Sequence, residues 1–294
     1  MKETTSLGAW VLASRPKTLP AAVAPVLVGT ACAKQADGLF LPAALAALVG
    51  AVLIQIGANF ANDLYDFKYG ADADDRLGPT RAVQSGTITA SAMTVGIAVV
   101  FTLAIAVGSY LVSLTGWPIV VVGIASILAA IAYTAGPYPL GYNGLGEVFV
   151  ILFFGFVAVC GTCYVQVGRI TSLALICSLN PGAMAAAILV VNNVRDAETD
   201  APSGKRTLAV RFGTGVGKIE YVALILVAYA VPAVVSAEIP WAFLPLLSTP
   251  LGVVVTRKVL RADSGPLYNR SLAATGGLML VQGFLLAFGI GLGD

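Results

Sequence analysis

Charged side chains are scarce in this 294-residue chain. Asp, Glu, Lys and Arg together make up 11% of the residues, whereas ordinary water-soluble domains carry roughly 25%. Apolar residues account for 58% and fall in long runs. So few charges could not cover the surface of a water-soluble fold of this length. The composition therefore indicates an integral membrane protein, and runs of about 20 apolar residues favour spanning helices over a β-barrel.

Histidine is absent and cysteine is rare. Without histidine the chain has no imidazole base, no Ser-His or Cys-His couple and no His-ligated zinc. Cys160 and Cys163 form a C-x-x-C pair, but no second Cys or His pair completes a zinc site, so we interpret the cysteines as packing residues. The net charge of only +2 does not suggest a nucleic-acid partner.

The apolar runs predict an all-α polytopic membrane protein that forms a single domain over residues 1–294. Nine runs each approach the ~20 residues that cross a bilayer. We expect nine transmembrane helices in a bundle around a central cavity, with an Asp-rich polar cap on the cytoplasmic side. The predicted spans are 18–33, 41–61, 90–112, 117–135, 145–165, 171–192, 217–237, 239–259 and 271–291.

The placement of Lys and Arg predicts the orientation in the membrane. With the N-terminus in the cytoplasm, 15 of the 17 basic residues fall inside, and only Lys34 and Arg169 fall outside. Inside loops are enriched in basic residues in membrane proteins. We therefore expect a multi-pass protein of the cell inner (plasma) membrane, with its N-terminus and its polar loops in the cytoplasm.

Acidic residues gather at the inside ends of two predicted spans. Eight of the 15 carboxylates lie in the stretches 59–76 and 192–200. In each stretch they recur with Asn at spacings of three or four, which places them on one face if the helix continues. Two carboxylates about 5 Å apart repel each other by about 3 kcal/mol at an effective dielectric of about 20. Oxygen-only ligand sets of this kind suit hard cations such as Mg²⁺ or Ca²⁺.

Basic residues follow both acidic stretches, and a metal combined with Lys and Arg is typical of a site that holds a di- or triphosphate. They are Lys68, Arg76 and Arg81 after the first stretch, and Lys205, Arg206 and Arg211 after the second. Glu147 is the single acid between Asp75 and Asp196 and enters the fifth span from the inside. A lone carboxylate there is costly unless it is paired or faces a polar cavity. We consider it either a general base or a helix cap.

At these residues the chain resembles the UbiA superfamily of intramembrane aromatic prenyltransferases. The N-D-x-x-D at 62–66 and the N-x-x-D-x-x-x-D at 193–200 look like the two Asp-rich motifs of that family. Further blocks resemble the branch that prenylates 1,4-dihydroxy-2-naphthoate for menaquinone synthesis. These blocks are Arg15–Pro20, Gly78–Arg81, Tyr133–Gly136, Gly144–Glu147, Asn192–Asp196 and Gly204–Thr207.

The resemblance implies transfer of a polyprenyl group from polyprenyl diphosphate to 1,4-dihydroxy-2-naphthoate, with loss of diphosphate and CO₂, to give demethylmenaquinol. It also implies Mg²⁺ as cofactor. Two departures stand out. Asn193 replaces the Asp of many members, and the Tyr-x-x-x-Lys of some members is missing because Tyr133 is followed by Pro137. We therefore expect the aromatic acceptor to be held differently from the acceptor of the hydroxybenzoate enzymes.

The expected site residues follow from these motifs and from the resemblance. The metal ligands are Asn62, Asp63, Asp66, Asp72, Asn193, Asp196 and Asp200, and the catalytic set is Asp63, Asp66, Asp196, Asp200 and Glu147. The substrate-binding set is Arg15, Lys17, Asn59, Asn62, Tyr65, Lys68, Arg81, Tyr133, Asn193, Lys205 and Arg206, with Phe149 and Phe153 as further candidates to line the prenyl pocket. Arg15 or Lys17 is expected to meet the naphthoate carboxylate.

Two alternatives remain open from the sequence. The first is an enzyme of the same superfamily with another aromatic acceptor. The second is a cation-coupled transporter of small anions, which needs ionisable groups or broken helices near the middle of the bilayer. The polar residues of this chain fall instead at one face, which favours the enzyme.

Overall fold

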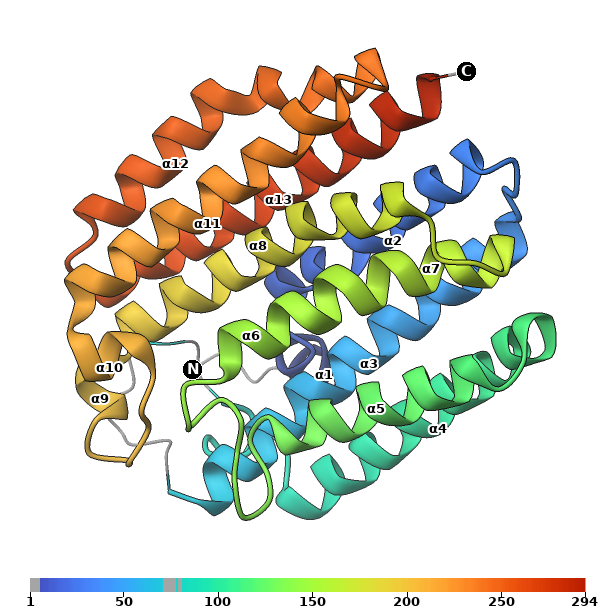
Figure 1. Ribbon diagram of the computed structural model, residues 1–294. Helices are drawn as coiled ribbons and strands as arrows, with labels where there is room; N and C mark the ends of the chain where they lie inside the picture. Colours follow the sequence, from blue (N-terminus) through green and yellow to red (C-terminus); the bar gives the residue numbers. More distant parts are fainter. Residues whose placement is uncertain (1–5, 71–77, 79–80, 294) are drawn as a thin grey trace.

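A computed structural model describes residues 6–70, 78 and 81–293, and every regular element within them is helical. In Figure 1 α11, α12 and α13 lie on one side of the bundle, α4 and α5 lie on the other, and α2, α3, α7 and α8 lie between them. The elements in chain order are α1 (Ser6–Ala13), η1 (Pro16–Thr18), α2 (Pro20–Gln35), α3 (Leu41–Lys68), α4 (Ala90–Thr115), α5 (Pro118–Ala132), α6 (Gly146–Val150), η2 (Ile151–Val157), α7 (Ala158–Val167), α8 (Ser172–Arg195), α9 (Ala197–Asp200), α10 (Leu208–Phe212), α11 (Thr214–Val235), η3 (Pro240–Ser248), α12 (Thr249–Arg261) and α13 (Gly265–Leu292).

The all-helical membrane fold predicted from the sequence is confirmed. Seven helical segments of the described residues are long and apolar enough to cross a bilayer. The other two predicted spans are also helical but shorter, since α2 has 16 residues and α5 has 15. At about 1.5 Å per residue, 15 residues reach only about 23 Å. The number of spans, nine, therefore stays a prediction.

Helix α8 is the central helix of the bundle and packs against α2, α11, α13 and η2. It approaches η2 closely because Gly155 and Gly182 face each other, and a Cβ on Gly155 would lie 2.7 Å from the carbonyl oxygen of Ser178. Pro232 cannot donate to the carbonyl of Ala228 in α11. The amide of Asn180 in α8 donates to that carbonyl instead, at 2.8 Å. A buried polar contact thus holds α8 to α11.

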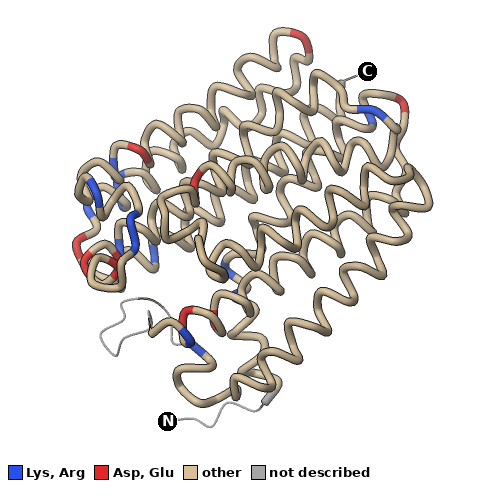
Figure 2. Tube along the Cα trace, turned by 60° about the horizontal axis from the view of Figure 1, so that its bottom comes forward, with Lys and Arg blue, Asp and Glu red and all other residues tan. Residues whose placement is uncertain are grey.

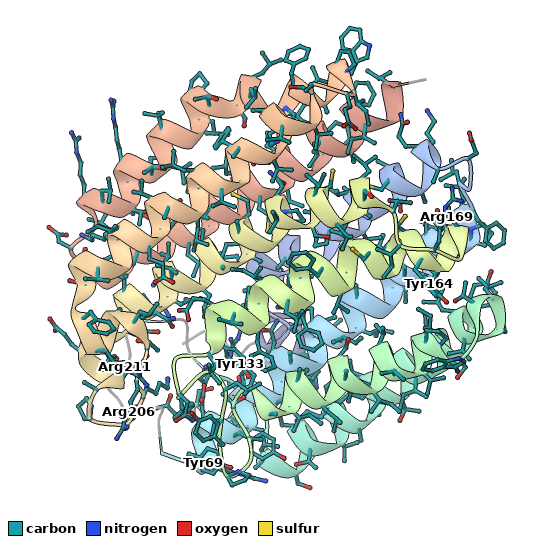
Figure 3. All side chains as sticks on the ribbon, viewed as in Figure 1. Tyr69, Tyr133, Tyr164, Arg169, Arg206 and Arg211 are labelled. Atoms are coloured by element: carbon teal, nitrogen blue, oxygen red, sulfur yellow. The ribbon has the colours of Figure 1, made fainter. Side chains whose placement is uncertain are left out.

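Charged residues are concentrated at the end of the bundle where α3 and α8 finish, as Figure 2 shows. In Figure 3 Arg206 and Arg211 lie at this end, and Arg169 lies at the opposite end. The short helix α1 folds against α3 near the charged end, with the rings of Trp10 and Phe60 5.2 Å apart. The chain then turns through Arg15, whose φ of 50° is left-handed, before α2 begins. These elements bring the two acidic stretches and Arg15 to the same side of the bundle.

Candidate active site

The first acidic cluster lies on the last turns of α3. This helix continues to Lys68, so Asn59, Asn62 and Asp66 share a face, as their spacing predicts. Asp66 is buried and pairs with the guanidinium of Arg81 at 2.6 Å. The side-chain oxygen of Asn62 accepts a hydrogen bond from the hydroxyl of Thr134 at 2.5 Å. The cluster is therefore ordered by the two loops that follow α3 and α5.

Asp63 faces a different part of the structure from Asp66. Its two carboxylate oxygens accept hydrogen bonds from the backbone N–H groups of Ala82 and Val83, both at 3.0 Å. The residue is only 1% exposed. Asp63 thus anchors the turn that carries Arg81 and thereby holds that guanidinium beside Asp66.

The second acidic cluster lies where α8 ends. The helix stops at Arg195 and Asp196 caps it. The helix therefore does not continue through Asp200, which the shared face of Asn193, Asp196 and Asp200 would require, and the short α9 follows instead. Arg195 donates from two nitrogens to the two oxygens of Asp196 at 2.7 and 2.6 Å, and from its third nitrogen to Asn269. Such bidentate pairs combine strength with a fixed geometry.

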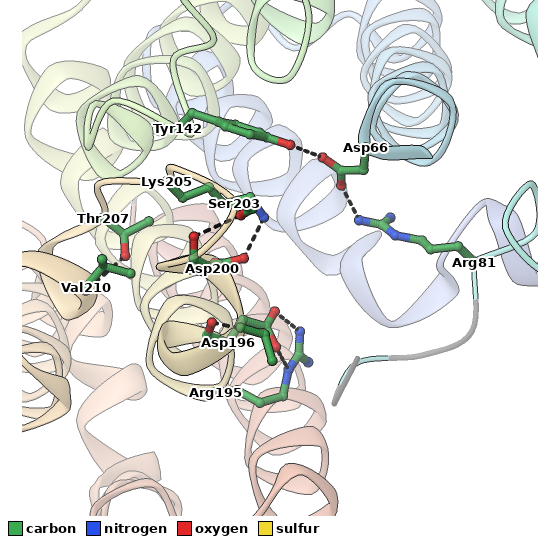
Figure 4. A network of polar contacts seen from close by, with 11 residues as sticks. Asp66, Arg81, Tyr142, Arg195, Asp196, Asp200, Ser203, Lys205, Thr207 and Val210 are labelled. Atoms are coloured by element: carbon green, nitrogen blue, oxygen red, sulfur yellow. Dashed lines mark hydrogen bonds and ion pairs between the residues drawn. The ribbon is translucent and has the colours of Figure 1, made fainter. Parts of the chain in front are cut away.

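Asp200 pairs with Lys205, whose ammonium lies 2.7 Å from one carboxylate oxygen. Burial raises the pKa of Asp200 above its usual value, and the charge of Lys205 offsets only part of this increase. Each of the three carboxylates Asp66, Asp196 and Asp200 therefore has one basic partner at contact distance. Figure 4 shows the three ion pairs in one view.

Tyr142 lies between the two clusters, on the loop that joins α5 to α6. Its hydroxyl donates to Asp66 at 3.0 Å. The ammonium of Lys205 lies over its ring, 5.1 Å from the centroid. In Figure 4 the side chain reaches from the side of the second cluster to Asp66. The two acidic stretches, 130 residues apart in the chain, thus form one continuous polar site.

A cavity of about 610 Å³ opens beside this polar site. Asn62 and Asn192 line it, and each lies four residues before a carboxylate of the site, Asp66 or Asp196. The remaining lining is mostly apolar and comes chiefly from helices α2 to α8 and η2. Phe149 and Phe153 line it with their rings stacked 6.2 Å apart. The cavity therefore has a polar mouth and a long apolar interior.

Tyr133 and Arg15 line the polar mouth. Two glycines leave room for the Tyr133 ring, because a Cβ on Gly141 would lie 2.8 Å from a ring carbon and a Cβ on Gly146 would lie 3.0 Å from the hydroxyl. Figure 3 shows Tyr133 at the end of α5, near α6. A phenol and a guanidinium at this point could bind a hydroxylated aromatic carboxylate.

Glu147 is buried at the start of α6 and accepts a hydrogen bond from the side-chain amide of Asn193 at 2.6 Å. The residues that line the cavity include its neighbour Phe149 but do not include Glu147. Because the Asn193 amide donates a hydrogen bond from its nitrogen to Glu147, its oxygen points away from Glu147. This hydrogen bond orients the side chain of Asn193, while the general base and the helix cap considered for Glu147 from the sequence stay predictions.

The other expected residues take the following positions. Lys17 is exposed and does not line the cavity, and the exposed Lys68 lies over the ring of Tyr65, 5.3 Å from its centroid. Asn59 lines the cavity and donates to the carbonyl of Ser14. Arg206 is exposed. Asp72 falls outside the described residues, so its expected role as a ligand stays a prediction.

Two residues of the site were not predicted from the sequence. Arg195 is buried and ion-paired, but from the sequence it counts only among the basic residues on the predicted cytoplasmic side and within the Asn192–Asp196 block. Tyr142 had no signal of its own except the glycine-rich segment around it. The contact of Tyr142 with Asp66 depends on the conformation of that loop, which the sequence does not reveal.

The donor set fits a hard cation. The polar site offers carboxylate and amide oxygens, and in the part of the chain that the structure describes it contains no sulfur or imidazole ligand. Among the described residues, no three His, Cys, Asp or Glu side chains are already gathered around a common point. Mg²⁺ needs only one or two carboxylates per ion when phosphate oxygens and water supply the rest. The arrangement therefore fits Mg²⁺ bound together with a phosphorylated substrate.

Comparison with known proteins identifies the family. Residues 22–290 match the UbiA prenyltransferase family. The chain belongs to this family. It is 38% identical over 282 residues to the 1,4-dihydroxy-2-naphthoate octaprenyltransferase of Mycobacterium leprae, with 96% of each chain covered. It is also 38% identical over 263 residues to the enzyme of the same name from Escherichia coli, with 86% and 85% covered.

Solved structures share the fold. A UbiA homolog from Archaeoglobus fulgidus bound to GPP and Mg²⁺ aligns with a TM-score of 0.68 at 14% identity, over 95% of this chain and 99% of that one. A UbiA homolog from Aeropyrum pernix aligns with the same TM-score and the same identity. This UbiA member is thus a multi-pass membrane prenyltransferase.

Proposed function

We propose that this protein transfers a polyprenyl group from polyprenyl diphosphate to 1,4-dihydroxy-2-naphthoate. The products are diphosphate, CO₂ and demethylmenaquinol. Relatives that are named for this activity align with most of the chain, which supports the choice of acceptor. The observation that carries the proposal is that an apolar cavity lies directly beside a charged site. A polyprenyl diphosphate has the same division into a charged head and a long apolar tail.

The charged site is suited to hold the diphosphate. Asp66, Asp196 and Asp200 would hold Mg²⁺ with the amide oxygens of Asn62 and Asn193. When bound, the cation neutralises the charge that develops on the departing diphosphate. Arg81, Arg195 and Lys205 lie beside the same carboxylates and can donate to phosphate oxygens. Asp63 supports this site through the turn that carries Arg81.

The cavity is suited to the tail and to the acceptor. Cleavage of the allylic diphosphate leaves a carbocation, which aromatic faces stabilise and which water would quench. Phe149 and Phe153 offer such faces in an apolar pocket. Arg15 and Tyr133 at the mouth can pair with the carboxylate and a hydroxyl of the naphthoate. The acceptor ring would then lie between the diphosphate site and the apolar interior.

We further propose that this site faces the cytoplasm of the cell, in the inner (plasma) membrane. The bias of Lys and Arg toward the end that carries the site supports this orientation. Transport of a small anion is disfavoured. Coupled transporters bind their ions near the middle of the bilayer, and Asp66, Asp196 and Asp200 lie at the ends of their helices.

Prenyl transfer by purified protein tests the proposal. The protein in lipid vesicles receives Mg²⁺, a polyprenyl diphosphate and, in separate reactions, 1,4-dihydroxy-2-naphthoate, 4-hydroxybenzoate or homogentisate. We expect a prenylated and decarboxylated product from the naphthoate, identified by mass spectrometry. EDTA should abolish its formation. A product from another acid alone would refute the choice of acceptor, and the absence of any prenylated product would refute the activity.

A further inference from the structure

The loop between α5 and α6 connects the two halves of the charged site. On the side of α3, the hydroxyl of Thr134 donates to Asn62, and the backbone N–H of Gly136 donates to the hydroxyl of Tyr69. Tyr142 adds the contact with Asp66. Three points of one loop thus hold the end of α3.

The same loop also contacts the segment that follows α9. The backbone N–H of Arg206 donates to the carbonyl of Tyr142 at 2.7 Å. Gly144 has a positive φ of 76°, and a Cβ there would lie 2.7 Å from the carbonyl oxygen of Arg206. Arg211 donates to the carbonyl of Asn143. Close backbone packing therefore fixes the loop to the segment that carries Lys205.

Tyr142 contacts charged groups of both halves of the site. Its hydroxyl lies on Asp66, and its ring lies under the ammonium that pairs with Asp200. A phenol that donates to a carboxylate fixes the orientation of that carboxylate, and a ring face under an ammonium restricts the flexible lysine side chain. Tyr142 thus adds a rigid aromatic link between Asp66 and Lys205 to the backbone contacts of its loop.

We propose that Tyr142 is a positioning residue that sets the spacing between the two halves of the diphosphate site. The inference rests on the proposed function, since it concerns the binding of metal and diphosphate there. Tyr142 does not take part in bond making. It holds Asp66 and Lys205 close enough together for both to contact the same diphosphate and its cations. Its loss should therefore weaken binding of the diphosphate and leave binding of the acceptor unchanged.

Two substitutions separate the hydroxyl from the ring. Tyr142→Phe keeps the ring under Lys205 and removes the hydrogen bond to Asp66. We expect it to raise the KM for polyprenyl diphosphate about tenfold, with little change in the KM for naphthoate. Tyr142→Leu also removes the ring and should raise the first KM about threefold further. Tyr138→Phe is the matched control, because Tyr138 lies on the same loop and is 59% exposed.

Calorimetric binding of inorganic pyrophosphate in the presence of Mg²⁺ provides a readout that needs no acceptor. Tyr142→Phe should weaken this binding by the same factor, whereas the melting temperature should stay close to that of the wild type. Wild-type binding of pyrophosphate by Tyr142→Phe would overturn the proposal, as would an equal loss in Tyr138→Phe. If the wild type prenylates no aromatic acid while Tyr142→Phe still weakens pyrophosphate binding, the proposed function fails and the positioning role stands.

Discussion

Asp63 and Asp66 lie three residues apart on one helix, yet they contact different groups. Asp66 pairs with a guanidinium, whereas Asp63 accepts two backbone N–H groups of the next turn. The sequence motif treats both as metal ligands. The conformation of residues 81–83 shows that Asp66 faces the charged site and that Asp63 holds the loop.

Replacement of Asp63 by Asn should test that separation. Asn keeps one acceptor oxygen but presents an NH₂ group to one of the two backbone N–H donors. We expect Asp63→Asn to lower the free energy of unfolding by about 1–3 kcal/mol, measured by denaturant unfolding in detergent. It should retain binding of Mg²⁺ with pyrophosphate, whereas the matched Asp66→Asn should lose it. Equal loss of binding in the two variants would identify Asp63 as a ligand.

Glu147 gives a second prediction at the scale of single residues. Its carboxylate accepts a hydrogen bond from Asn193, and Gln can accept the same bond through its amide oxygen. If Glu147 orients Asn193, Glu147→Gln should keep kcat within about threefold of the wild type, and Glu147→Leu should lose about tenfold or more. A general base would behave differently, since Glu147→Gln would then lower kcat about 100-fold. Measurement of kcat from pH 6 to 9 decides between the two roles.

At the scale of helices, glycines give the cavity its width. Gly108 on α4, Gly123 on α5 and Gly161 on α7 line the cavity, and a Cβ on any of them would meet no atom within 4 Å. Gly123 lies ten residues before Tyr133, which is about 15 Å along the helix. A larger side chain at this position would extend into the space that we assign to the prenyl tail.

Gly123→Leu should therefore shorten the tail that the protein accepts. We expect kcat/KM for an octaprenyl diphosphate to fall about tenfold or more, with little change for geranyl diphosphate. Gly277→Leu on α13 is the matched control, because its side chain would also meet open space but Gly277 does not line the cavity. An equal fall for both diphosphates would show that the tail does not pass Gly123.

At the scale of the whole molecule, the sequence predicted the parts of the site better than their connections. Apolar runs and one-sided charge predicted the helical bundle, because a bilayer imposes span length and hydropathy directly. The spacing of Asn62 and Asp66 predicted a shared helical face. The bidentate pair of Arg195 with Asp196 and the bridge through Tyr142 depend on loop conformations and on contacts between distant segments. No local pattern carries that information.

The three ion pairs predict how the metal and the diphosphate bind. Asp66, Asp196 and Asp200 each contact one basic group, Arg81, Arg195 or Lys205, at 2.6 or 2.7 Å. If a cation binds one of these carboxylates without diphosphate, the basic group of that pair loses its partner. If diphosphate binds a basic group without the cation, the carboxylate of that pair loses its partner. For the buried pair of Arg81 with Asp66, the loss of one partner costs about 3–5 kcal/mol. When both bind together, the carboxylates turn to the cation and the basic groups turn to phosphate oxygens.

Mg²⁺ and pyrophosphate should therefore each increase the affinity of the protein for the other, by about 5- to 150-fold. Calorimetry measures each affinity with and without the second ligand. Because Mg²⁺ and pyrophosphate also associate in solution, the decisive comparison is with Arg195→Gln, which frees Asp196 of its partner. In this variant Mg²⁺ alone should bind more tightly than in the wild type, and the coupling should decrease. Arg257→Gln, which removes an exposed charge from α12, should leave the coupling unchanged. Wild-type coupling in Arg195→Gln would show that the ion pairs do not exchange partners when the ligands bind.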